Sequence, residues 1–365
     1  MKNICFFSGD ITRPGGTERV STIIANGLAA AGNYRICFLS IVEGRQEPSF
    51  FLSPDIPRYR LKDGGKWISP GPGYLPLLPA LRRFIKKHRI DVIIDIDLVL
   101  DILSIPAAFG TPAKVLAWEH FHYYYEQESL YRRIIAAFSA RFADYMVVLT
   151  PQDLRNYQEK LKRRDRIDYI FNPLESSFDC PTSADSREKM ILTVGRLNSF
   201  KGIDLLAQIV PKVLQAHADW KWYFLGEGEY RGILEDVRSR CRLEDRLILT
   251  GVVNHVEDYL KRTSLCVLAS RTEPFGMCIL EAKACGVPCV SFDVPYGPSI
   301  IIEDGQNGFL IPPFDLNRMA EKILLLMEDT ALRERFIQNT GLGMEKFRLE
   351  PILKKWEELL DSMLS

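Results

Sequence analysis

A-S-R-T-E-P-F-G-M-C-I-L-E-A-K-A-C-G, residues 269–286, is the stretch from which the rest of the chain can be interpreted. It follows a short apolar run at residues 265–268 that predicts a buried strand. Residues 272–276 carry turn-forming side chains, and residues 277–284 have the composition of a helix that ends at Gly286. The start of such a helix offers free backbone N–H groups and the positive end of the helix dipole, which together favour a phosphate group.

Two glutamates flank this predicted phosphate site. Glu273 lies in the loop before the helix, and Glu281 lies inside the helix. Carboxylates accept hydrogen bonds from hydroxyl groups, so the arrangement suits a ligand with phosphates in the middle and hydroxyl-rich groups at both ends, as in a nucleotide sugar. The spacing by itself is more typical of a solvated loop residue followed by a helix surface residue, and the rest of the chain decides between these interpretations.

Length and composition exclude several classes of protein. A chain of 365 residues is long enough for two domains with separate cores. Equal numbers of basic and acidic residues, 47 of each, argue against a nucleic-acid partner. The eight cysteines form no C-x2-C pair and have no metal-binding spacing with the five histidines, which predicts a reducing, cytoplasmic location. The N-terminus lacks the features of a signal peptide, and aspartates interrupt the most apolar long window, so no membrane-spanning helix is expected.

Apolar runs alternate with helical patterns along the whole chain. This alternation is typical of α/β folds with parallel sheets. Strands are expected at residues 3–7, 35–41, 92–95, 113–118, 145–149 and 168–170, and again at 190–194, 220–225, 247–249, 265–268 and 288–292. Between the two series, Asn172 and Pro173 precede a segment with the polar composition of a linker.

Glycines and charged groups follow two predicted strands of the first half. Gly15 and Gly16 precede a helix, so a ligand can approach the backbone closely there, although a plain strand–helix turn explains the same letters. The spacing is not G-x-G-x-x-G and therefore does not indicate a dinucleotide site. Glu119 and His120 follow the strand at 113–118, and open parallel sheets hold ligands at such strand ends. A buried structural histidine is the alternative for His120.

Cations follow the first predicted strand of the second half. Gly195, Arg196 and Lys201 come after the run at 190–194. A guanidinium and an ammonium group can converge on a diphosphate and balance the charge that grows on it when a bond to it breaks. Gly251 and Val252 follow a further predicted strand in the same half.

Taken in order, these residues resemble the motifs of the retaining glycosyltransferases of family 4, which include bacterial polysaccharide and lipopolysaccharide transferases. The resemblance covers nearly the whole chain. It rests on E-x7-E at Glu273 and Glu281, on G-R-L…K-G from Gly195, and on E-H and G-G-x-E in the first half. It implies an α/β fold of the GT-B type, in which two Rossmann-like domains face a cleft and the C-terminal helix crosses back to the first domain. Residues 1–173 with 349–365 would bind the acceptor, and residues 174–348 would bind the nucleotide sugar.

The resemblance also implies a role for each motif residue. Glu281 would bind the ribose, Glu273 the donor sugar, and Arg196 and Lys201 the leaving diphosphate. The donor-binding set is Gly16, Gly195, Arg196, Lys201, Gly251, Val252, Glu273, Phe275, Gly276, Met277 and Glu281. The acceptor side is Gly15, Gly16, Glu119 and His120, and the catalytic set is Arg196, Lys201, Glu273 and His120. No cofactor is expected. No metal is expected either, because D-x-D occurs only at residues 95–97, in or beside a strand of the first half.

These roles predict a hexosyltransferase that retains the anomeric configuration. The donor would be a UDP-hexose such as UDP-galactose, UDP-glucose or an N-acetylated form, and the acceptor a lipid-linked oligosaccharide or polysaccharide of the bacterial cell surface. Three alternatives stay open: a GDP-mannose-dependent mannosyltransferase, a nucleotide-sugar epimerase of the same fold, and a noncatalytic sugar-nucleotide sensor.

A basic run in the first half suggests a location for the reaction. Arg82, Arg83, Lys86, Lys87 and Arg89 lie on a helix predicted over residues 77–88, and the aromatic residues at 67 and 74 lie just before it. Such a run is either a solvated helix face or a surface that binds anionic lipid on the inner face of the cytoplasmic membrane.

Overall fold

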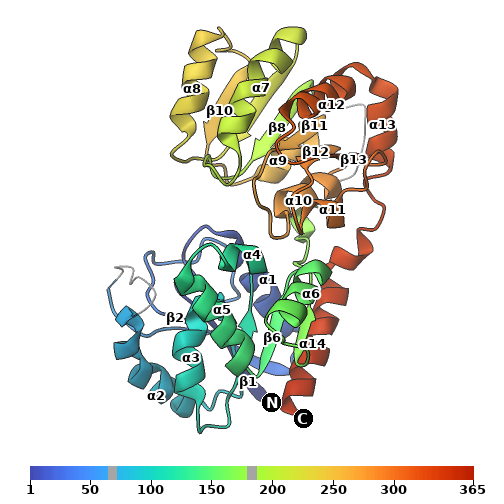
Figure 1. Cartoon of the computed structure of the whole chain (residues 1–365). Coiled ribbons are helices and arrows are strands. Elements are labelled where there is room, and N and C mark those ends of the chain that lie inside the picture. Colours follow the sequence, from blue (N-terminus) through green and yellow to red (C-terminus); the bar gives the residue numbers. More distant parts are fainter. Residues whose placement is uncertain (65–71, 179–186) are drawn as a thin grey trace. The chain divides into compact units, whose positions relative to one another are not determined.

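The computed structural model describes residues 1–64, 72–178 and 187–365. The chain divides into two compact units, Met1–Pro173 with Lys346–Ser365, and Leu174–Glu345 (Figure 1). The chain returns to the first unit at Lys346, slightly before the position 349 expected from the sequence. The acceptor and donor roles of the two units stay predictions.

The first unit is built on a parallel sheet with the strand order β3-β2-β1-β4-β5-β6-β7 in the described residues. Its strands are β1 (Lys2–Ser8), β2 (Tyr34–Ser40), β3 (Arg58–Arg60), β4 (Val92–Ile96), β5 (Lys114–Trp118), β6 (Tyr145–Val148) and β7 (Ile167–Tyr169). Its α-helices are α1 (Gly16–Ala30), α2 (Leu78–His88), α3 (Asp101–Ala108), α4 (Tyr123–Glu126), α5 (Leu130–Phe142), α6 (Pro151–Lys160) and α14 (Leu349–Leu364). Short 3₁₀ turns cover Pro72–Leu77 and Leu98–Leu100.

The second unit repeats this plan with the strand order β10-β9-β8-β11-β12-β13. Its strands are β8 (Met190–Val194), β9 (Lys221–Leu225), β10 (Leu247–Gly251), β11 (Leu265–Leu268), β12 (Cys289–Phe292) and β13 (Gly308–Ile311). Its α-helices are α7 (Ile203–Ala216), α8 (Arg231–Arg240), α9 (Val256–Arg262), α10 (Met277–Ala284), α11 (Pro298–Ile301), α12 (Leu316–Glu328) and α13 (Thr330–Gln338). Further 3₁₀ turns cover Ser176–Phe178 and Glu345–Phe347.

The central strands are apolar on both faces because helices cover both sides of each sheet. In β4, Val92, Ile93 and Ile94 are completely buried, and in β11, Leu265 and Val267 are too. These continuous apolar runs made the strands predictable from the sequence. The fold class is confirmed: each unit is a Rossmann-like parallel α/β domain.

Cysteines occupy the inner strands, as the sequence indicates. Cys5 of β1 is in register with Cys37 of β2, and Cys266 of β11 with Cys289 of β12. All four are buried free thiols, so they serve as small core residues.

The C-terminal helix α14 packs on the first unit, as predicted. The completely buried Trp356 meets Trp118 edge to face, with ring centroids 4.7 Å apart. The Tyr34 hydroxyl donates a hydrogen bond of 2.7 Å to Asp361, and the Lys114 ammonium donates to the carbonyl of Met363. The helix therefore supports the strand β5, whose end carries Glu119 and His120.

Two sequence expectations near the basic helix need correction. The side chain of Tyr74 is buried in the core of the first unit and does not accompany the basic face. Arg82 donates hydrogen bonds to the carbonyls of Ala107 and Phe109, so its charge ties α2 to the end of α3. The tryptophan at 67, also expected beside this helix, lies outside the described residues.

Replacing Trp356 by alanine is expected to destabilise the fold by about 3–5 kcal/mol, because it leaves a cavity under β5. Chemical denaturation monitored by circular dichroism measures the change. Lys354→Ala, on the exposed side of the same helix, provides the control and should stay within about 0.5 kcal/mol of the parent. Equal stabilities of the two variants would mean that α14 does not support the sheet.

Candidate active site

The loop between β11 and α10 holds Glu273 at the carboxyl end of the second sheet. The loop turns into the helix at Gly276, whose φ of 93° is in the left-handed region that favours glycine. The backbone of Glu273 forms a parallel bridge with Tyr296, and its carbonyl accepts a hydrogen bond of 3.0 Å from the amide of Gly297. These main-chain contacts fix the position of Glu273 independently of its side chain.

A second loop, after β8, packs closely against this one. A Cβ at Gly202 would lie 1.9 Å from the carbonyl oxygen of Ala269, so only glycine permits the approach. The amide of Arg271 donates to the carbonyl of Phe200 over 2.8 Å. This contact brings Lys201, on the β8 loop, to the carboxylate of Glu273.

Lys201 and Glu273 form an ion pair inside the second unit. The Lys201 ammonium lies 2.6 Å from Oε2 of Glu273, and the hydroxyl of Ser270 donates to the same oxygen over 3.1 Å. Glu273 is only 6% exposed. Burial alone would lower the pKa of Lys201, but the negative charges around it, chiefly that of Glu273, raise it. Lys201 therefore carries its charge at neutral pH.

Glu281 belongs to the same group of charges. It lies on α10, is 4% exposed, and contributes to raising the pKa of Lys201. The two glutamates of the E-x7-E pattern are thus both buried, which contradicts the interpretation that they are solvated surface residues.

Arg196 differs from Lys201 in its surroundings. It follows β8 directly, is exposed, and forms no hydrogen bond or ion pair through its guanidinium within the described residues. Its five N–H donors are therefore available at the same end of the sheet.

The remaining donor-side candidates lie on the loops that follow the strands of the second sheet. Gly251 ends β10, and the side chain of Val252 after it is 72% exposed. Phe275 is buried in the loop before α10, and Met277 begins that helix, half-buried. The second unit thus contains all of these candidates but one: Gly195, Arg196, Lys201, Val252, Glu273, Phe275 and Gly276 on loops after strands of its sheet, Gly251 at the end of β10, and Met277 and Glu281 on α10. Gly16 lies in the first unit.

In the first unit, Gly15 and Gly16 lie at the junction of β1 and α1. Gly15 caps the helix and Gly16 is its first residue. Beneath them, the buried carboxylate of Glu18 accepts a hydrogen bond of 2.9 Å from Nε of Arg13. This side-chain pair orders the glycine loop, and Arg13 was not singled out by the sequence.

Glu119 is part of the protein interior. Its Oε1 accepts a 2.7 Å hydrogen bond from the amide of Phe121, and its Oε2 accepts one of 2.9 Å from the hydroxyl of Tyr157. Complete burial raises the pKa of this carboxyl well above its usual range. Glu119, expected on the acceptor side, therefore acts on the site by positioning the loop that carries His120.

His120 is buried, and one of its ring nitrogens is completely enclosed without a partner among the described residues. The side chain is 6% exposed and its ring lies 4.3 Å from that of Trp118. Its Nε2 has no hydrogen-bond partner in the described part of the chain. Burial lowers its pKa to about 3, so the ring is neutral at physiological pH and Nε2 can accept or donate one hydrogen bond, depending on the tautomer.

The described residues contain no cluster of metal-binding side chains. Across 1–64, 72–178 and 187–365, no group of three or more His, Cys, Asp or Glu side chains is placed to hold an ion. Asp95 lies inside β4, is completely buried and accepts a hydrogen bond from Ser104. The expectation of a metal-free reaction stays a prediction.

Comparison with known proteins identifies the family. A model described as "Glycosyl transferases group 1" matches residues 180–341, and one described as "Glycosyltransferase Family 4" matches residues 14–178. Together they span both units. The chain belongs to glycosyltransferase family 4. This glycosyltransferase has the GT-B fold and is a transferase.

Relatives of this glycosyltransferase occur among bacteria. An uncharacterised glycosyltransferase of Haemophilus influenzae is 29% identical over 360 residues, covering 99% of this chain and 100% of the relative. The lipopolysaccharide 1,6-galactosyltransferase of Escherichia coli is 25% identical over 244 residues, covering 65% of this chain and 66% of the relative. The structure of HepE from Anabaena with UDP and glucose superposes with a TM-score of 0.81 at 20% identity, over 98% of this chain and 99% of that one, which supports the fold.

The neutral state of His120 gives a pH prediction. Its pKa falls from about 6.5 in an unfolded chain to about 3 in the fold. The associated stability is therefore fully present above the unfolded pKa and decreases as the pH falls below it. In an NMR titration from pH 8 to pH 5, the His120 ring resonance, assigned by its loss in His120→Gln, should not shift. A titration midpoint near 6.5 would contradict the buried environment.

Proposed function

We propose that this glycosyltransferase moves a hexose from a nucleotide sugar to a hydroxyl of a lipid-linked oligosaccharide or polysaccharide, with retention at the anomeric carbon. The observation that carries the proposal is the pairing of the half-buried Lys201 with the buried Glu273, near the buried Glu281, together with Arg196, whose guanidinium has no partner among the described residues. The relatives support the substrate class, since the relative from Escherichia coli is a lipopolysaccharide galactosyltransferase.

The charges suit the parts of such a donor. Arg196 and Lys201 supply two cations for a diphosphate, and a leaving group gains negative charge as the glycosidic bond breaks. Glu273 and Glu281 supply acceptors for hydroxyls of the sugar and the ribose. Glu273 has a second function, because its charge holds the ammonium of Lys201 in place.

The retaining step needs a base for the acceptor hydroxyl. In the proposed reaction the acceptor attacks on the face from which the diphosphate leaves, and a phosphate oxygen takes the acceptor's proton. The bond from the anomeric carbon to the phosphate oxygen breaks, and the bond to the acceptor oxygen forms. We propose no metal ion in this step, because Arg196 and Lys201 would together balance the diphosphate charge.

A nucleotide-sugar screen tests the proposal. We expect one donor, of the UDP-hexose class, to raise the melting temperature, since a ligand that binds the folded state stabilises it by mass action. With that donor and a glycan acceptor, Arg196→Ala should lower turnover by about 100-fold or more, as for loss of one transition-state donor. Arg240→Ala, at the exposed end of α8, provides the control.

Each outcome of this screen has a distinct meaning. Stabilisation by GDP-mannose alone would replace the donor and keep the reaction class. Conversion of the donor without any acceptor into its epimer would indicate an epimerase. Stabilisation without turnover on any glycan acceptor would indicate a sensor, and no response to any nucleotide sugar would overturn the proposal.

We also propose that the protein works at an anionic membrane surface. Among the described residues, no helix is long and apolar enough to cross a bilayer. Helices α2, α3 and α5 lie side by side in the first unit (Figure 1). On α2, the cations at Arg83, Lys86 and Lys87 are exposed. Basic side chains near an anionic bilayer each contribute about 1 kcal/mol.

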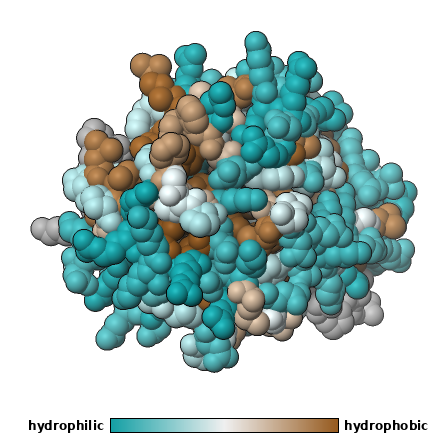
Figure 2. Space-filling view, turned by 90° about the horizontal axis from the view of Figure 1, so that it is seen from below, coloured by the Kyte–Doolittle hydropathy of each residue, from teal (hydrophilic) through white to brown (hydrophobic). Residues whose placement is uncertain are grey.

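The outward face of α5 strengthens this proposal. Four large hydrophobic side chains are exposed on it: Leu130, Tyr131, Ile134 and Phe142, by 70, 40, 60 and 55%. Exposed arginines at 133 and 141 flank them. The view from below shows exposed hydrophobic residues among the hydrophilic ones (Figure 2). A helix with an apolar face and basic flanks is typical of proteins that lie in the membrane interface.

Two variants separate the contributions to membrane binding. Reversing Arg83, Lys86 and Lys87 to glutamate should abolish co-sedimentation with vesicles that contain anionic lipid. The double variant Ile134→Ser, Phe142→Ser should weaken vesicle binding at least tenfold. It should also lower the fraction that stays bound at 1 M salt, where a Debye length of about 3 Å screens the charges. Ile233→Ser, on α8 of the second unit, is the matched control. A wild type that ignores these vesicles, or that forms a dimer through α5 instead, would contradict the proposal.

A further inference from the structure

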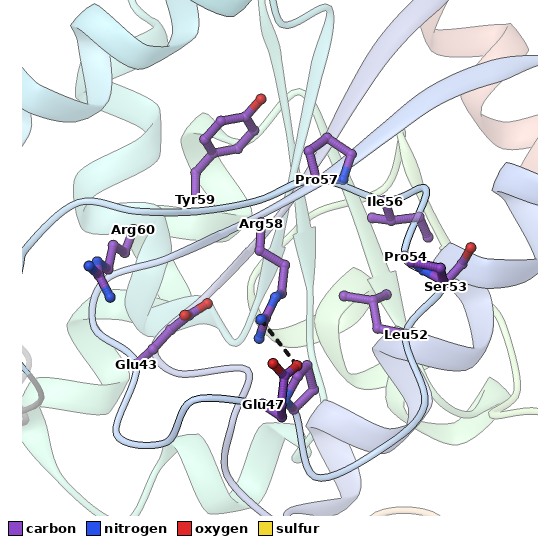
Figure 3. A pocket seen from close by; sticks show the side chains of 11 residues that line it. Glu43, Glu47, Leu52, Ser53, Pro54, Ile56, Pro57, Arg58, Tyr59 and Arg60 are labelled. Atoms are coloured by element: carbon purple, nitrogen blue, oxygen red, sulfur yellow. Dashed lines mark hydrogen bonds and ion pairs between the residues drawn. The ribbon is translucent and has the colours of Figure 1, made fainter.

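The first unit contains a pocket that the donor and acceptor motifs do not include. It lies beside β3, the edge strand of the sheet, and has a volume of about 690 Å³. This is within the range of about 300–1,000 Å³ that small-molecule sites occupy. Its lining combines four charged side chains, Glu43, Glu47, Arg58 and Arg60, with the apolar groups of Leu52 and Ile56 (Figure 3).

The loop that encloses the pocket is fixed to α1. Asn26 of that helix donates a hydrogen bond of 2.9 Å to the carbonyl of Phe51, and its side-chain oxygen accepts one of 2.9 Å from the amide of Ser53. The pocket wall is therefore held by the helix that begins at Gly16.

The same loop is fixed to the loop between β1 and α1. The amide of Gly44 donates to Asp10 over 3.1 Å, and the amide of Arg45 donates to the hydroxyl of Thr12 over 3.1 Å. The hydroxyl of Ser49 donates to the carbonyl of Thr12 over 2.8 Å. The pocket is thus attached to the loop that carries Gly15 and Gly16, on the predicted acceptor side.

Two buried polar atoms in this pocket have no partner within the described residues. They are Nη1 of Arg58 and Oε1 of Glu43. The guanidinium is oriented by its other nitrogen, Nη2, which lies 3.2 Å from the carbonyl of Gln46 and 3.3 Å from Glu47. In Figure 3, Arg58 and Glu43 point into the pocket, whereas Tyr59 points away from it. Burial raises the pKa of Glu43, in keeping with its poor solvation.

An unused buried donor and an unused buried acceptor each cost about 1–3 kcal/mol. A ligand that bonds to both groups would recover this cost. A hydroxyl both donates and accepts, so neighbouring hydroxyls of one sugar ring complement Arg58 and Glu43 together. The four charged groups that line the pocket are two of each sign, which favours a neutral ligand over an anion.

We propose that this pocket binds a neutral sugar unit of the acceptor glycan, with Arg58 donating to and Glu43 accepting from its hydroxyls. The inference rests on the proposed glycan acceptor and adds a second point of recognition beside the loop of Gly15 and Gly16. Recognition there selects acceptors by a sugar other than the one that receives the hexose.

Ligand-observed NMR on the full chain tests the site without requiring turnover. The probes are the methyl glycosides of glucose, galactose and N-acetylglucosamine, with inorganic phosphate as the anionic comparison. We expect at least one glycoside to bind the wild type, and Glu43→Ala and Arg58→Ala each to weaken that binding at least tenfold. Arg35→Ala, an exposed arginine on the neighbouring strand β2, should bind as the wild type does.

Melting temperatures of the variants show whether a loss of glycoside binding comes from the pocket or from unfolding. The Glu43 carboxylate has a buried oxygen that accepts no hydrogen bond within the described residues. Glu43→Ala should therefore keep the melting temperature of the wild type, although this variant no longer binds the glycoside. Glu43→Gln keeps an acceptor oxygen and should retain most of the binding. UDP binding should be unchanged in all of these variants, so a failure of the donor proposal and a failure of this one remain distinguishable.

Three outcomes would overturn the inference: no glycoside binds the wild type, glycoside binding survives both alanine substitutions, or phosphate alone binds and is lost with Arg58→Ala. The last outcome would make the pocket an anion site.

Discussion

The ion pair of Lys201 and Glu273 joins two loops that are 72 positions apart in the chain, and the candidate donor site depends on it. The Glu273 carboxylate could not remain buried alone, because an isolated charge in a protein interior is strongly disfavoured. Together they place an ammonium group and a carboxylate side by side at the carboxyl edge of the second sheet. The close packing at Gly202 makes this approach possible. Arg196 is not part of this pair. The protein therefore fixes the position of the Lys201 ammonium, whereas the Arg196 guanidinium has no protein partner among the described residues.

In the first unit, two buried side chains differ in whether their polar atoms are hydrogen-bonded. Glu119 and His120 are neighbours in the sequence and both are buried, yet Glu119 has both oxygens bonded inside the protein whereas His120 keeps Nε2 unused. Glu43 and Arg58 repeat the second pattern at the sheet edge. Among the described residues, buried polar atoms without partners thus occur beside the β5 end and in the pocket attached to the β1–α1 loop, and also in the interior of the same unit, as at Asp95.

Much of this architecture could be predicted from the sequence, for identifiable reasons. Strands such as β4 and β11 are continuous apolar runs, and α10 is bounded by glycines, so both were expected close to their observed limits. Helix α5 was not expected, because apolar residues such as Leu130 and Ile134 lie on its exposed face and obscure the usual periodicity. Strand β3 has the sequence Arg-Tyr-Arg, with no apolar signal at all. The burial of Glu119 and Tyr74 depends on partners distant in the chain, such as Tyr157, which local patterns do not reveal.

The return of α14 to the first unit has a consequence for how the molecule is held together. The chain passes between the units twice, and the two passages lie next to each other, with the rings of Phe171 and Phe347 5.2 Å apart. A cut in one passage would leave the other intact, and Trp356 would still anchor the severed portion to Trp118. The enzyme is thus suited to being produced as two separate polypeptides, divided after residue 173, that reassemble through this helix. A gene fission at that point is one that the fold would tolerate.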